Sequence, residues 1–199
     1  MSKLFQMTKK VVIIHCWDGT PDYCWYPWLK KKLELEGFFV KVPTMPETGL
    51  PKQKLWVKKM EKVIGEPNPN LIVVGHSIGC ITILRYLESL KEGQSIAGAV
   101  LIAGFTSDLG FKELKNYFET PLNWEKIKSH CSKFVAIHSN NDPYVDLKYG
   151  YEFKEKLGAQ LIVKSKKGHF SGAVDDEKSC TKLPDVLTSV LEISGKTKA

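Results

Sequence analysis

Short apolar segments recur along the chain, separated by stretches in which apolar residues return every three or four positions. The apolar segments lie at 11–15, 38–42, 71–75, 97–104, 133–139 and 159–165. Each is short and rich in Val, Ile, Leu or Phe, a composition typical of strands that are buried on both faces. We therefore expect about six strands, which pair side by side in one sheet.

The stretches between these segments predict helices. Longer helical patterns cover 25–36, 52–64, 78–90 and 144–157, two shorter ones fall at 111–118 and 124–130, and a last helix is expected over 183–193. Gly37, Gly65 and Gly158 directly follow three of the patterns, as expected of the residue that ends a helix. Strands that alternate with helices are joined by right-handed crossovers into a parallel sheet. The predicted fold class is a doubly wound α/β fold, with helices on both faces of the sheet.

Nothing in the pattern divides the chain into parts. There is no internal repeat or low-complexity tract, and the longest plain connecting loop is at 43–51. The irregular segment at 106–124 predicts an excursion above the edge of the sheet. Because 199 residues are enough for one domain with a sizeable core, we expect a single α/β domain over residues 1–199.

Charge and composition narrow the classes of partner. The net charge is +7, but the lysines are spread among the helical segments instead of forming one block. This distribution favours a solvated basic surface over a nucleic-acid interface. No run approaches the roughly 18 apolar residues of a membrane span, and the first ten residues lack the apolar segment of a secretory signal. We expect no membrane span and a cytoplasmic location.

The cysteines indicate neither a disulfide framework nor a metal site. There are five, an odd number, without a CxxC motif or zinc-type spacing to histidines. We therefore expect reduced thiols, no metal ligands and no organic cofactor.

A serine between two glycines interrupts the apolar sequence at the end of the third strand. Gly75-His76-Ser77-Ile78-Gly79 matches GxSxG, and it stands between a predicted strand and a predicted helix. This is the context of a nucleophile elbow, in which the serine occupies a turn so tight that its backbone is strained. Its hydroxyl then projects from the carboxyl edge of the sheet. Ser77 is the candidate nucleophile; the other interpretation is a serine that only caps the helix.

A serine hydroxyl needs a histidine base and a carboxylate, in the chain order Ser, Asp, His. His169 follows the last predicted strand, which returns it to the edge where Ser77 lies. Asp142 follows the strand before it, and Pro143 disfavours helix there, whereas Asp146 is expected to face outward from the next helix. Asp142 and His169 are the predicted partners, with Asp108 as the reserve acid.

Hydrolysis through a serine also requires donors for the oxyanion and walls for the substrate. The donors are expected to be the backbone N–H groups of Ile78 and of the loop after the first strand, where we favour Trp17. Trp17, Phe105, Trp124 and Phe170 fall near loops or helix starts and are the candidate substrate-binding residues. Aromatic side chains suit apolar acyl or aryl groups.

Several short motifs together resemble one known family, the small α/β-hydrolases of the retinoblastoma-binding protein 9 and YdeN type. The motifs are WYPWL at 25–29, MP at 45–46, GHSIG at 75–79, TSDLG at 106–110, YF and WEKI within 117–127, NDP at 141–143 and GHF at 168–170. The likeness covers nearly the whole chain. It implies a shortened serine hydrolase domain that cleaves small esters or aminoacyl amides, with catalytic roles for Ser77, Asp142 and His169.

Two features depart from that family. The early loop reads HCWDG, where many relatives have a glycine-rich run, so the resemblance does not identify the amide that completes the oxyanion hole. The Leu-x-Cys-x-Glu stretch associated with retinoblastoma protein is missing, so binding to that protein is not inferred.

Two alternatives to serine chemistry stay open from the sequence. A hydrolase scaffold can serve as a non-catalytic protein-interaction module, because a fold does not dictate a function. Cys16 or Cys80 could supply a thiol nucleophile near the site, although Cys80 is expected on the buried face of its helix, where thiols are usually inert.

Overall fold

The computed structural model describes residues 9–171 and 180–196, and within them one sheet of six parallel strands. The strands are β1 (Lys10–Ile14), β2 (Phe39–Lys41), β3 (Leu71–His76), β4 (Gly98–Ile102), β5 (Phe134–Ser139) and β6 (Gln160–Lys164). Their order in the sheet is β2-β1-β3-β4-β5-β6. The predicted doubly wound α/β fold is confirmed.

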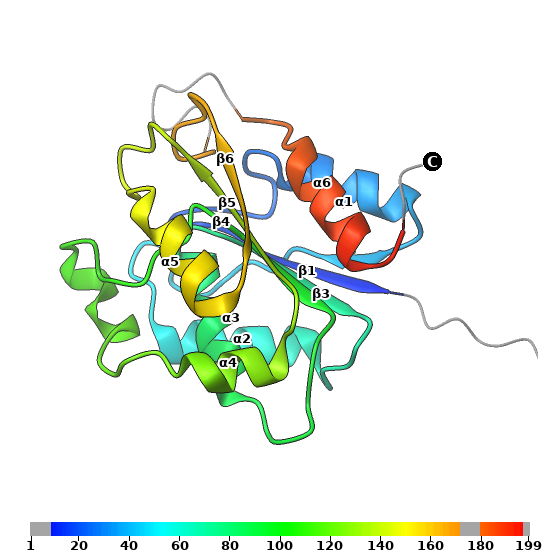
Figure 1. Cartoon of the computed structure of the whole chain (residues 1–199), viewed down its shortest axis with the longest axis horizontal. Helices are drawn as coiled ribbons and strands as arrows, with labels where there is room; N and C mark the ends of the chain where they lie inside the picture. Colours follow the sequence, from blue (N-terminus) through cyan, green and yellow to red (C-terminus); the bar gives the residue numbers. More distant parts are fainter. Residues whose placement is uncertain (1–8, 172–179, 197–199) are drawn as a thin grey trace, which may run out of the picture.

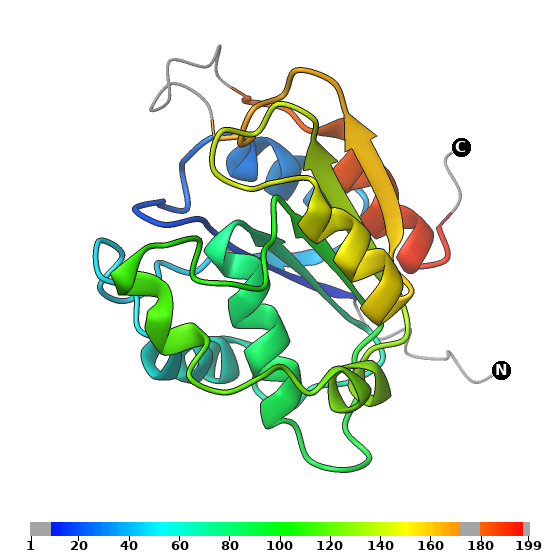
Figure 2. The same cartoon turned by 60° about the vertical axis from the view of Figure 1, so that its left-hand side comes forward.

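Helices cover both faces of this sheet (Figure 1). They are α1 (Tyr26–Leu35), α2 (Gln53–Ile64), α3 (Ile78–Ser89), α4 (Trp124–His130), α5 (Lys148–Leu157) and α6 (Pro184–Ile193). One core cluster lies between the sheet and α1 and α6, and the other lies between the sheet and α2, α3, α4 and α5. Figure 2 shows the green segment between β4 and α4, with the 3-10 helix η1 (Lys112–Tyr117), passing beside α3.

Each helix buries one stripe of side chains against the sheet. In α2 the buried residues are Trp56, Met60 and Ile64, spaced so that they share one face. Burial of side chains of this size contributes roughly 1.5–3 kcal/mol each. The central strand β3 is buried at every position, as its unbroken apolar run predicts.

Two elements differ from the pattern-based prediction. The helix expected from residue 144 begins only at Lys148, because the Asp142 carboxylate accepts hydrogen bonds from the Tyr144 and Val145 amides and holds a turn there. The segment at 111–118 forms a 3-10 helix in place of an α-helix. Both differences lie in the loops above the carboxyl edge of the sheet.

The strand order places a crevice above the carboxyl ends of β1 and β3. After β1 the chain passes outward to β2, and it then returns to pair β3 on the other side of β1. Ligands of open α/β sheets bind outside the carboxyl ends of the strands at such a switch point. Because the strands are parallel, the loops after β1, β3, β4, β5 and β6 all lie along this carboxyl edge of the sheet.

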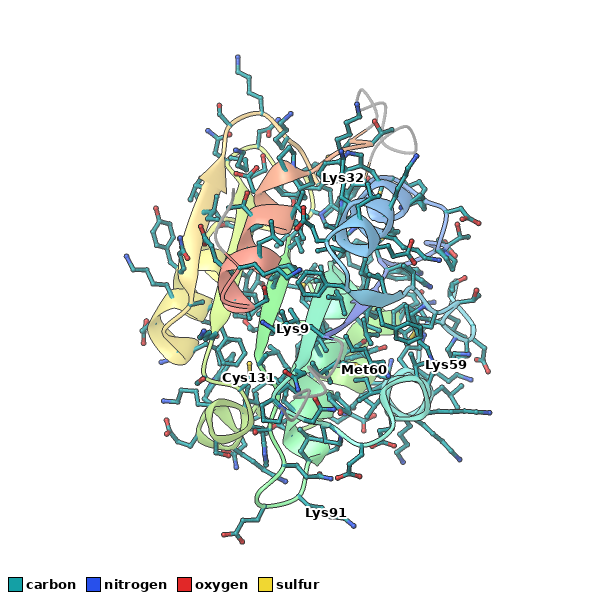
Figure 3. The ribbon with its side chains drawn as sticks, turned by 90° about the vertical axis from the view of Figure 1, so that its right-hand side faces the viewer. Lys9, Lys32, Lys59, Met60, Lys91 and Cys131 are labelled. Atoms are coloured by element: carbon teal, nitrogen blue, oxygen red, sulfur yellow. The ribbon has the colours of Figure 1, made fainter. Side chains whose placement is uncertain are left out.

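The basic residues are dispersed over the surface. In Figure 3, Lys32 on α1, Lys59 on α2 and Lys91 after α3 lie at separate places on the molecule.

Within 9–171 and 180–196, no helix is long and apolar enough to cross a bilayer. Residues 1–8, the first part of the segment considered as a signal sequence, lie outside the described residues.

The approach of α3 to β1 leaves no room for a side chain at Gly79. A Cβ atom there would overlap the Ile14 carbonyl oxygen and lie 3.1 Å from that of His15. We expect Gly79→Ala to lower the free energy of unfolding by about 2 kcal/mol or more, because backbone cannot yield as a flexible side chain does. Chemical denaturation measures this change. In the control Gly49→Ala, the added methyl group would meet only the Asp18 carboxylate, and a comparable loss there would contradict the explanation.

Candidate active site

Ser77 joins β3 to α3 in a strained backbone conformation. Its φ is 55° and its ψ is −119°, a region that residues with a side chain rarely adopt. The Ser77 side chain makes no hydrogen bond that caps α3, so the capping interpretation is wrong. Gly75 and Gly79 make the turn possible, because a Cβ on either would collide with backbone of α3 or β1. The hydroxyl is left free for another partner.

That partner is His169, which the structure brings together with Asp142. Ser77 Oγ lies 2.9 Å from His169 Nε2, and His169 Nδ1 lies 2.8 Å from Asp142 Oδ2. Since a carboxylate can only accept, Nδ1–H donates to Asp142, which leaves Nε2 able to accept the Ser77 proton. The Asp142 side chain is only 2% exposed, so its charge acts on the histidine with little screening by water.

Polar side chains next to Asp142 tie its loop to the His169 loop. Asn141 Oδ1 accepts hydrogen bonds from Ser139 Oγ at 2.8 Å and from the Gly168 amide at 3.0 Å. Ser139 Oγ accepts from the Lys167 amide at 2.9 Å, and Asn140 Oδ1 accepts from the Lys166 amide. These contacts hold the Asp142 loop and the His169 loop together, in addition to the direct bond between the two side chains. The sequence signal for these contacts is the pair of consecutive asparagines before Asp142, which the apolar pattern does not report.

A second hydrogen-bonded chain runs beneath the serine. His76 Nε2–H donates to the His169 carbonyl oxygen at 2.7 Å, so its Nδ1 must accept, and it does so from the Tyr26 hydroxyl at 2.6 Å. The Tyr26 oxygen accepts in turn from the Cys16 amide at 3.1 Å. Burial, together with nearby His169, lowers the pKa of His76 to about 3, which keeps the ring neutral and this pattern intact.

The amides near Ser77 include two that can bind an oxyanion. Ile78 is the first residue of α3, so its N–H has no acceptor within the helix. The Cys16 amide is already bonded to Tyr26, whereas the Trp17 N–H has no protein acceptor within the described residues. This arrangement favours Trp17 over Cys16 as the second donor.

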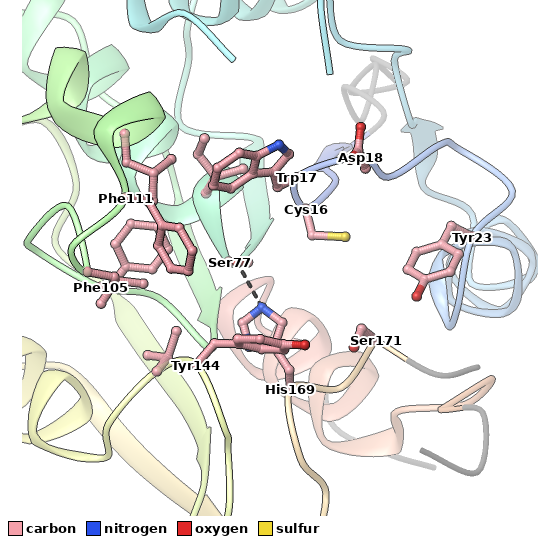
Figure 4. Close-up of a pocket in the computed structure, with 14 residues that line it drawn as sticks. Cys16, Trp17, Asp18, Tyr23, Ser77, Phe105, Phe111, Tyr144, His169 and Ser171 are labelled. Atoms are coloured by element: carbon pink, nitrogen blue, oxygen red, sulfur yellow. Dashed lines mark hydrogen bonds between the residues drawn. The ribbon is translucent and has the colours of Figure 1, made fainter. Parts of the chain in front are cut away.

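A pocket of about 410 Å³ opens around Ser77 and His169. In Figure 4, Phe105 and Phe111 lie on one side of these residues, and Tyr23, Ser171 and Cys16 lie on the other. Its lining residues are Cys16, Trp17, Asp18, Tyr23, Ser77, Ile78, Phe105, Leu109, Phe111, Leu114, Tyr144, Val145, His169 and Ser171. Trp17 and Phe105, both predicted from the sequence, therefore line the pocket, and residues of the 106–124 excursion form part of its wall.

Comparison with known proteins identifies the family of this chain. The model of the family described as Serine hydrolase matches residues 11–185. The chain belongs to the serine hydrolase family. It is 31% identical over 187 residues to the YdeN hydrolase of Bacillus subtilis, covering 92% of this chain and 96% of that protein. It is also 32% identical over 167 residues to the serine hydrolase RBBP9 of Rattus norvegicus, covering 82% and 87% of the two proteins.

Solved structures share the fold of this serine hydrolase. The crystal structure of the ydeN gene product from B. subtilis has a TM-score of 0.88 at 28% identity, over 95% of this chain and 100% of that chain. Est1E from Butyrivibrio proteoclasticus has a TM-score of 0.72 at 13% identity, over 95% of this chain and 89% of that chain. At so low an identity, the likeness to Est1E shows the fold alone.

Two predicted substrate-binding residues of the hydrolase lie elsewhere. Trp124 starts α4, and the preceding residue, Asn123, donates its amide hydrogen to Glu88 at the carboxyl end of α3. Ser77 precedes the opposite end of α3, about 15 Å away at 1.5 Å per residue. Phe170 is fully buried in the core cluster beneath α1 and α6, because the turn at its positive φ of 58° directs it away from the pocket. Neither side chain lines the pocket.

The structure also shows the surroundings of Asp108, the reserve acid, and of Cys80, an alternative nucleophile. Asp108 accepts a hydrogen bond from the Gly110 amide in its own turn, and the carboxylate bonded to His169 belongs to Asp142. The Cys80 thiol donates to the Gly75 and Ile102 carbonyl oxygens, and burial raises its pKa. Such a thiol is a poor nucleophile. Among the described residues, no cluster of His, Cys, Asp or Glu is arranged to hold a metal ion.

Tyr26 provides a stability test of the buried chain of hydrogen bonds. Tyr26→Phe would remove the hydrogen bonds that the Tyr26 hydroxyl makes with the Cys16 amide and with His76 Nδ1, at a cost of roughly 1–3 kcal/mol for each buried group. We expect the free energy of unfolding to fall accordingly in urea denaturation. Tyr86→Phe is the matched control, because the Tyr86 hydroxyl is buried and has no hydrogen-bond partner among the described residues. Equal losses in the two variants would contradict the role of Tyr26.

Proposed function

We propose that this chain hydrolyses small esters or amides of acyl or aminoacyl groups, with Ser77 as nucleophile. The observation that carries the proposal is the unbroken chain of contacts from Ser77 Oγ to His169 at 2.9 Å and from His169 to Asp142 at 2.8 Å. Membership of the serine hydrolase family supports the same reaction class. In this proposal His169 is the general base, and Asp142 orients its ring and stabilises the imidazolium.

The first half-reaction forms an acyl-enzyme. Ser77 Oγ attacks the substrate carbonyl carbon while its proton passes to His169 Nε2. The carbonyl oxygen gains the negative charge and accepts hydrogen bonds from the Ile78 and Trp17 amides, and the N-terminal end of α3 adds favourable potential. When the intermediate collapses, His169 returns the proton to the leaving alcohol or amine. The acyl group stays bonded to Ser77.

The second half-reaction repeats these steps with water. His169 Nε2 takes a proton from a water molecule, which attacks the acyl carbon and passes through a second oxyanion. Collapse breaks the bond to Ser77 Oγ, which recovers its proton from His169. The products are a carboxylic acid and the free hydroxyl of Ser77, so no cofactor enters the balance.

The pocket supports a substrate with one apolar part. Phe105, Leu109, Phe111 and Leu114 form an apolar wall, which suits an acyl chain or an aromatic ring. The other side carries the hydroxyl groups of Tyr23 and Ser171, which can hydrogen-bond to a polar group of the substrate. A panel of p-nitrophenyl esters and aminoacyl-coumarin amides, compared by kcat/KM, would rank these classes.

Other predictions from the sequence are not tested by the fold or the relatives. A cytoplasmic location, a single domain over the whole chain, and the absence of nucleic-acid partners stay predictions. The alternative, a non-catalytic interaction module, is tested by the same variants as the proposed hydrolase. Such a module requires no reactive serine, so it predicts no turnover or labelling that depends on Ser77.

The triad can be tested by turnover and by labelling. Ser77→Ala and His169→Ala should lower kcat for a p-nitrophenyl ester by roughly 10⁴–10⁶-fold, and Asp142→Asn somewhat less, as for triads that act as a unit. A fluorophosphonate probe should label the native protein and not Ser77→Ala. Asp108→Asn is the matched control, because among the described residues its carboxylate bonds only within its own turn. Labelling that survives Ser77→Ala would discredit the assignment.

The apolar wall can be tested at Phe111, a residue that is 43% exposed and whose side chain can be removed without opening the core. Phe111→Ala should lower kcat/KM for a hexanoate ester roughly tenfold, through about 1–2 kcal/mol of lost apolar contact, while the acetate ester is affected little. Phe39→Ala, an exposed phenylalanine on β2 outside the pocket, is the control. Equal effects on both esters would argue against an acyl group on this wall.

A further inference from the structure

The peptide unit between Cys16 and Trp17 is held in place by its carbonyl group. The Cys16 carbonyl oxygen accepts a hydrogen bond from the Gly19 amide at 3.1 Å. It also lies 2.8 Å from His15 Nδ1, and since a carbonyl can only accept, Nδ1–H is the donor. This peptide unit contains the Trp17 N–H, which the proposed function assigns to the oxyanion hole.

The tautomer of His15 is set by a second contact. The Met45 amide donates to His15 Nε2 at 3.1 Å, so Nε2 must carry the lone pair and Nδ1 must carry the hydrogen. Both ring nitrogens are therefore used in the one arrangement that satisfies both partners. Burial lowers the pKa of His15, which favours this neutral form.

His15 is enclosed by the protein and is not part of the pocket lining. Its side chain is fully buried, and its ring packs edge-on against Trp56 of α2 at 5.4 Å between centroids. A Cβ on Gly19 would lie 2.9 Å from the Cys16 carbonyl oxygen and 3.1 Å from His15 Nδ1. Glycine at position 19 is thus what allows the ring and the carbonyl to meet.

Fixing the carbonyl fixes the amide of the same peptide. A trans peptide is planar, so its N–H points away from its C=O, and the Trp17 N–H cannot turn without breaking the bonds to His15 and Gly19. The flanking Cys16 amide is held separately by the Tyr26 hydroxyl at 3.1 Å. Two donors on one carbonyl also polarise the peptide, which strengthens its N–H as a donor.

We propose that His15 is a positioning residue for hydrolysis: its Nδ1–H holds the Cys16 carbonyl so that the Trp17 N–H is directed at the oxyanion. The inference rests on the proposed function, and it assigns to a buried histidine outside the triad a role in stabilising the transition state. Because His15 acts through a peptide, its loss should affect kcat more than KM.

Two conservative variants separate the two contacts of His15. Asparagine carries its amide nitrogen as many bonds from Cα as Nδ1, so His15→Asn keeps a donor for the Cys16 carbonyl. Glutamine carries its amide oxygen as many bonds from Cα as Nε2, so His15→Gln keeps an acceptor for the Met45 amide and loses the donor. Each variant gives up one buried hydrogen bond, so both should lose stability in thermal denaturation.

The two variants should differ in turnover. With a p-nitrophenyl ester, His15→Gln should lower kcat roughly 10–100-fold, less than the 10²–10³-fold typical of deleting a donor outright, with KM nearly unchanged. His15→Asn should keep kcat close to that of the native protein. Gly19→Ala, which displaces the same carbonyl, should behave like His15→Gln and provides a second test if His15→Gln does not fold.

The affinity for a transition-state analogue separates a positioning role of His15 from a purely structural one. A trifluoromethyl ketone adds reversibly to the serine and leaves its oxygen where the oxyanion develops, so its affinity should fall by the same factor as kcat/KM in His15→Gln and not in His15→Asn. His130→Gln is the matched control. His130 is also buried and contacts one backbone carbonyl, that of Gln94 at 2.7 Å, but it ends α4 and is not part of the pocket lining. This variant should lose stability and keep kcat.

The outcomes distinguish the inference from the function on which it rests. If Ser77→Ala keeps its activity and its labelling, the proposed function fails whatever His15 does. If Ser77 is required but His15→Gln and Gly19→Ala keep native kcat and inhibitor affinity, the role of His15 is overturned. It is also overturned if His15→Asn and His15→Gln lose kcat equally, because that result would reflect only damage to the fold.

Discussion

A serine with φ of 55° and ψ of −119° joins β3 to α3, and it holds this conformation because Gly75 and Gly79 have no side chains. The close approach at Gly79 brings the start of α3 against the Ile14 and His15 carbonyl groups at the end of β1. One tight turn thus sets the position of the hydroxyl, of the Ile78 amide and of the loop that follows β1. Strain of this kind, of order 1–3 kcal/mol, persists only where the surrounding structure enforces it.

Around this turn, hydrogen bonds with fixed directions connect the loops that meet at the carboxyl edge of the sheet. The Met45 amide donates to His15, His76 donates to the His169 carbonyl, and Asn141 accepts from the Gly168 amide. His15 and His76 are fully buried, and burial lowers the pKa of each. A neutral histidine ring can donate at one nitrogen and accept at the other, so it can connect a carbonyl group to a hydrogen-bond donor. A charged ring or an apolar side chain could not make both bonds.

The fold and the site contribute different kinds of information about function. Structural likeness to Est1E at 13% identity shows that this framework occurs in proteins of distant sequence, and a shared framework does not specify a substrate. In this chain the pocket has an apolar wall built largely from the excursion between β4 and α4. Substrate preference should therefore depend on this excursion, whereas the proposed chemistry would depend on the loops after β3, β5 and β6.

The sequence by itself determined the order of strands and helices, the parallel sheet and the identity of the three triad candidates. Apolar periodicity reports which residues are buried, and the carboxyl ends of parallel strands meet at one edge, so Ser77, Asp142 and His169 could be matched from their places in the chain. Local geometry was harder to predict from the sequence. The start of α5 at Lys148 depends on a turn held by the Asp142 carboxylate, which no pattern of apolar residues reports.

Only the tertiary structure decided which aromatic residues face the site. Trp124 and Phe170 are aromatic residues near loops, as Trp17 and Phe105 are, yet the first pair lies away from the pocket and the second lines it. The direction of a side chain depends on the backbone angles of its loop and on the element packed against it. The same holds for His15, whose partner Met45 is distant in sequence and becomes a neighbour only when the sheet assembles.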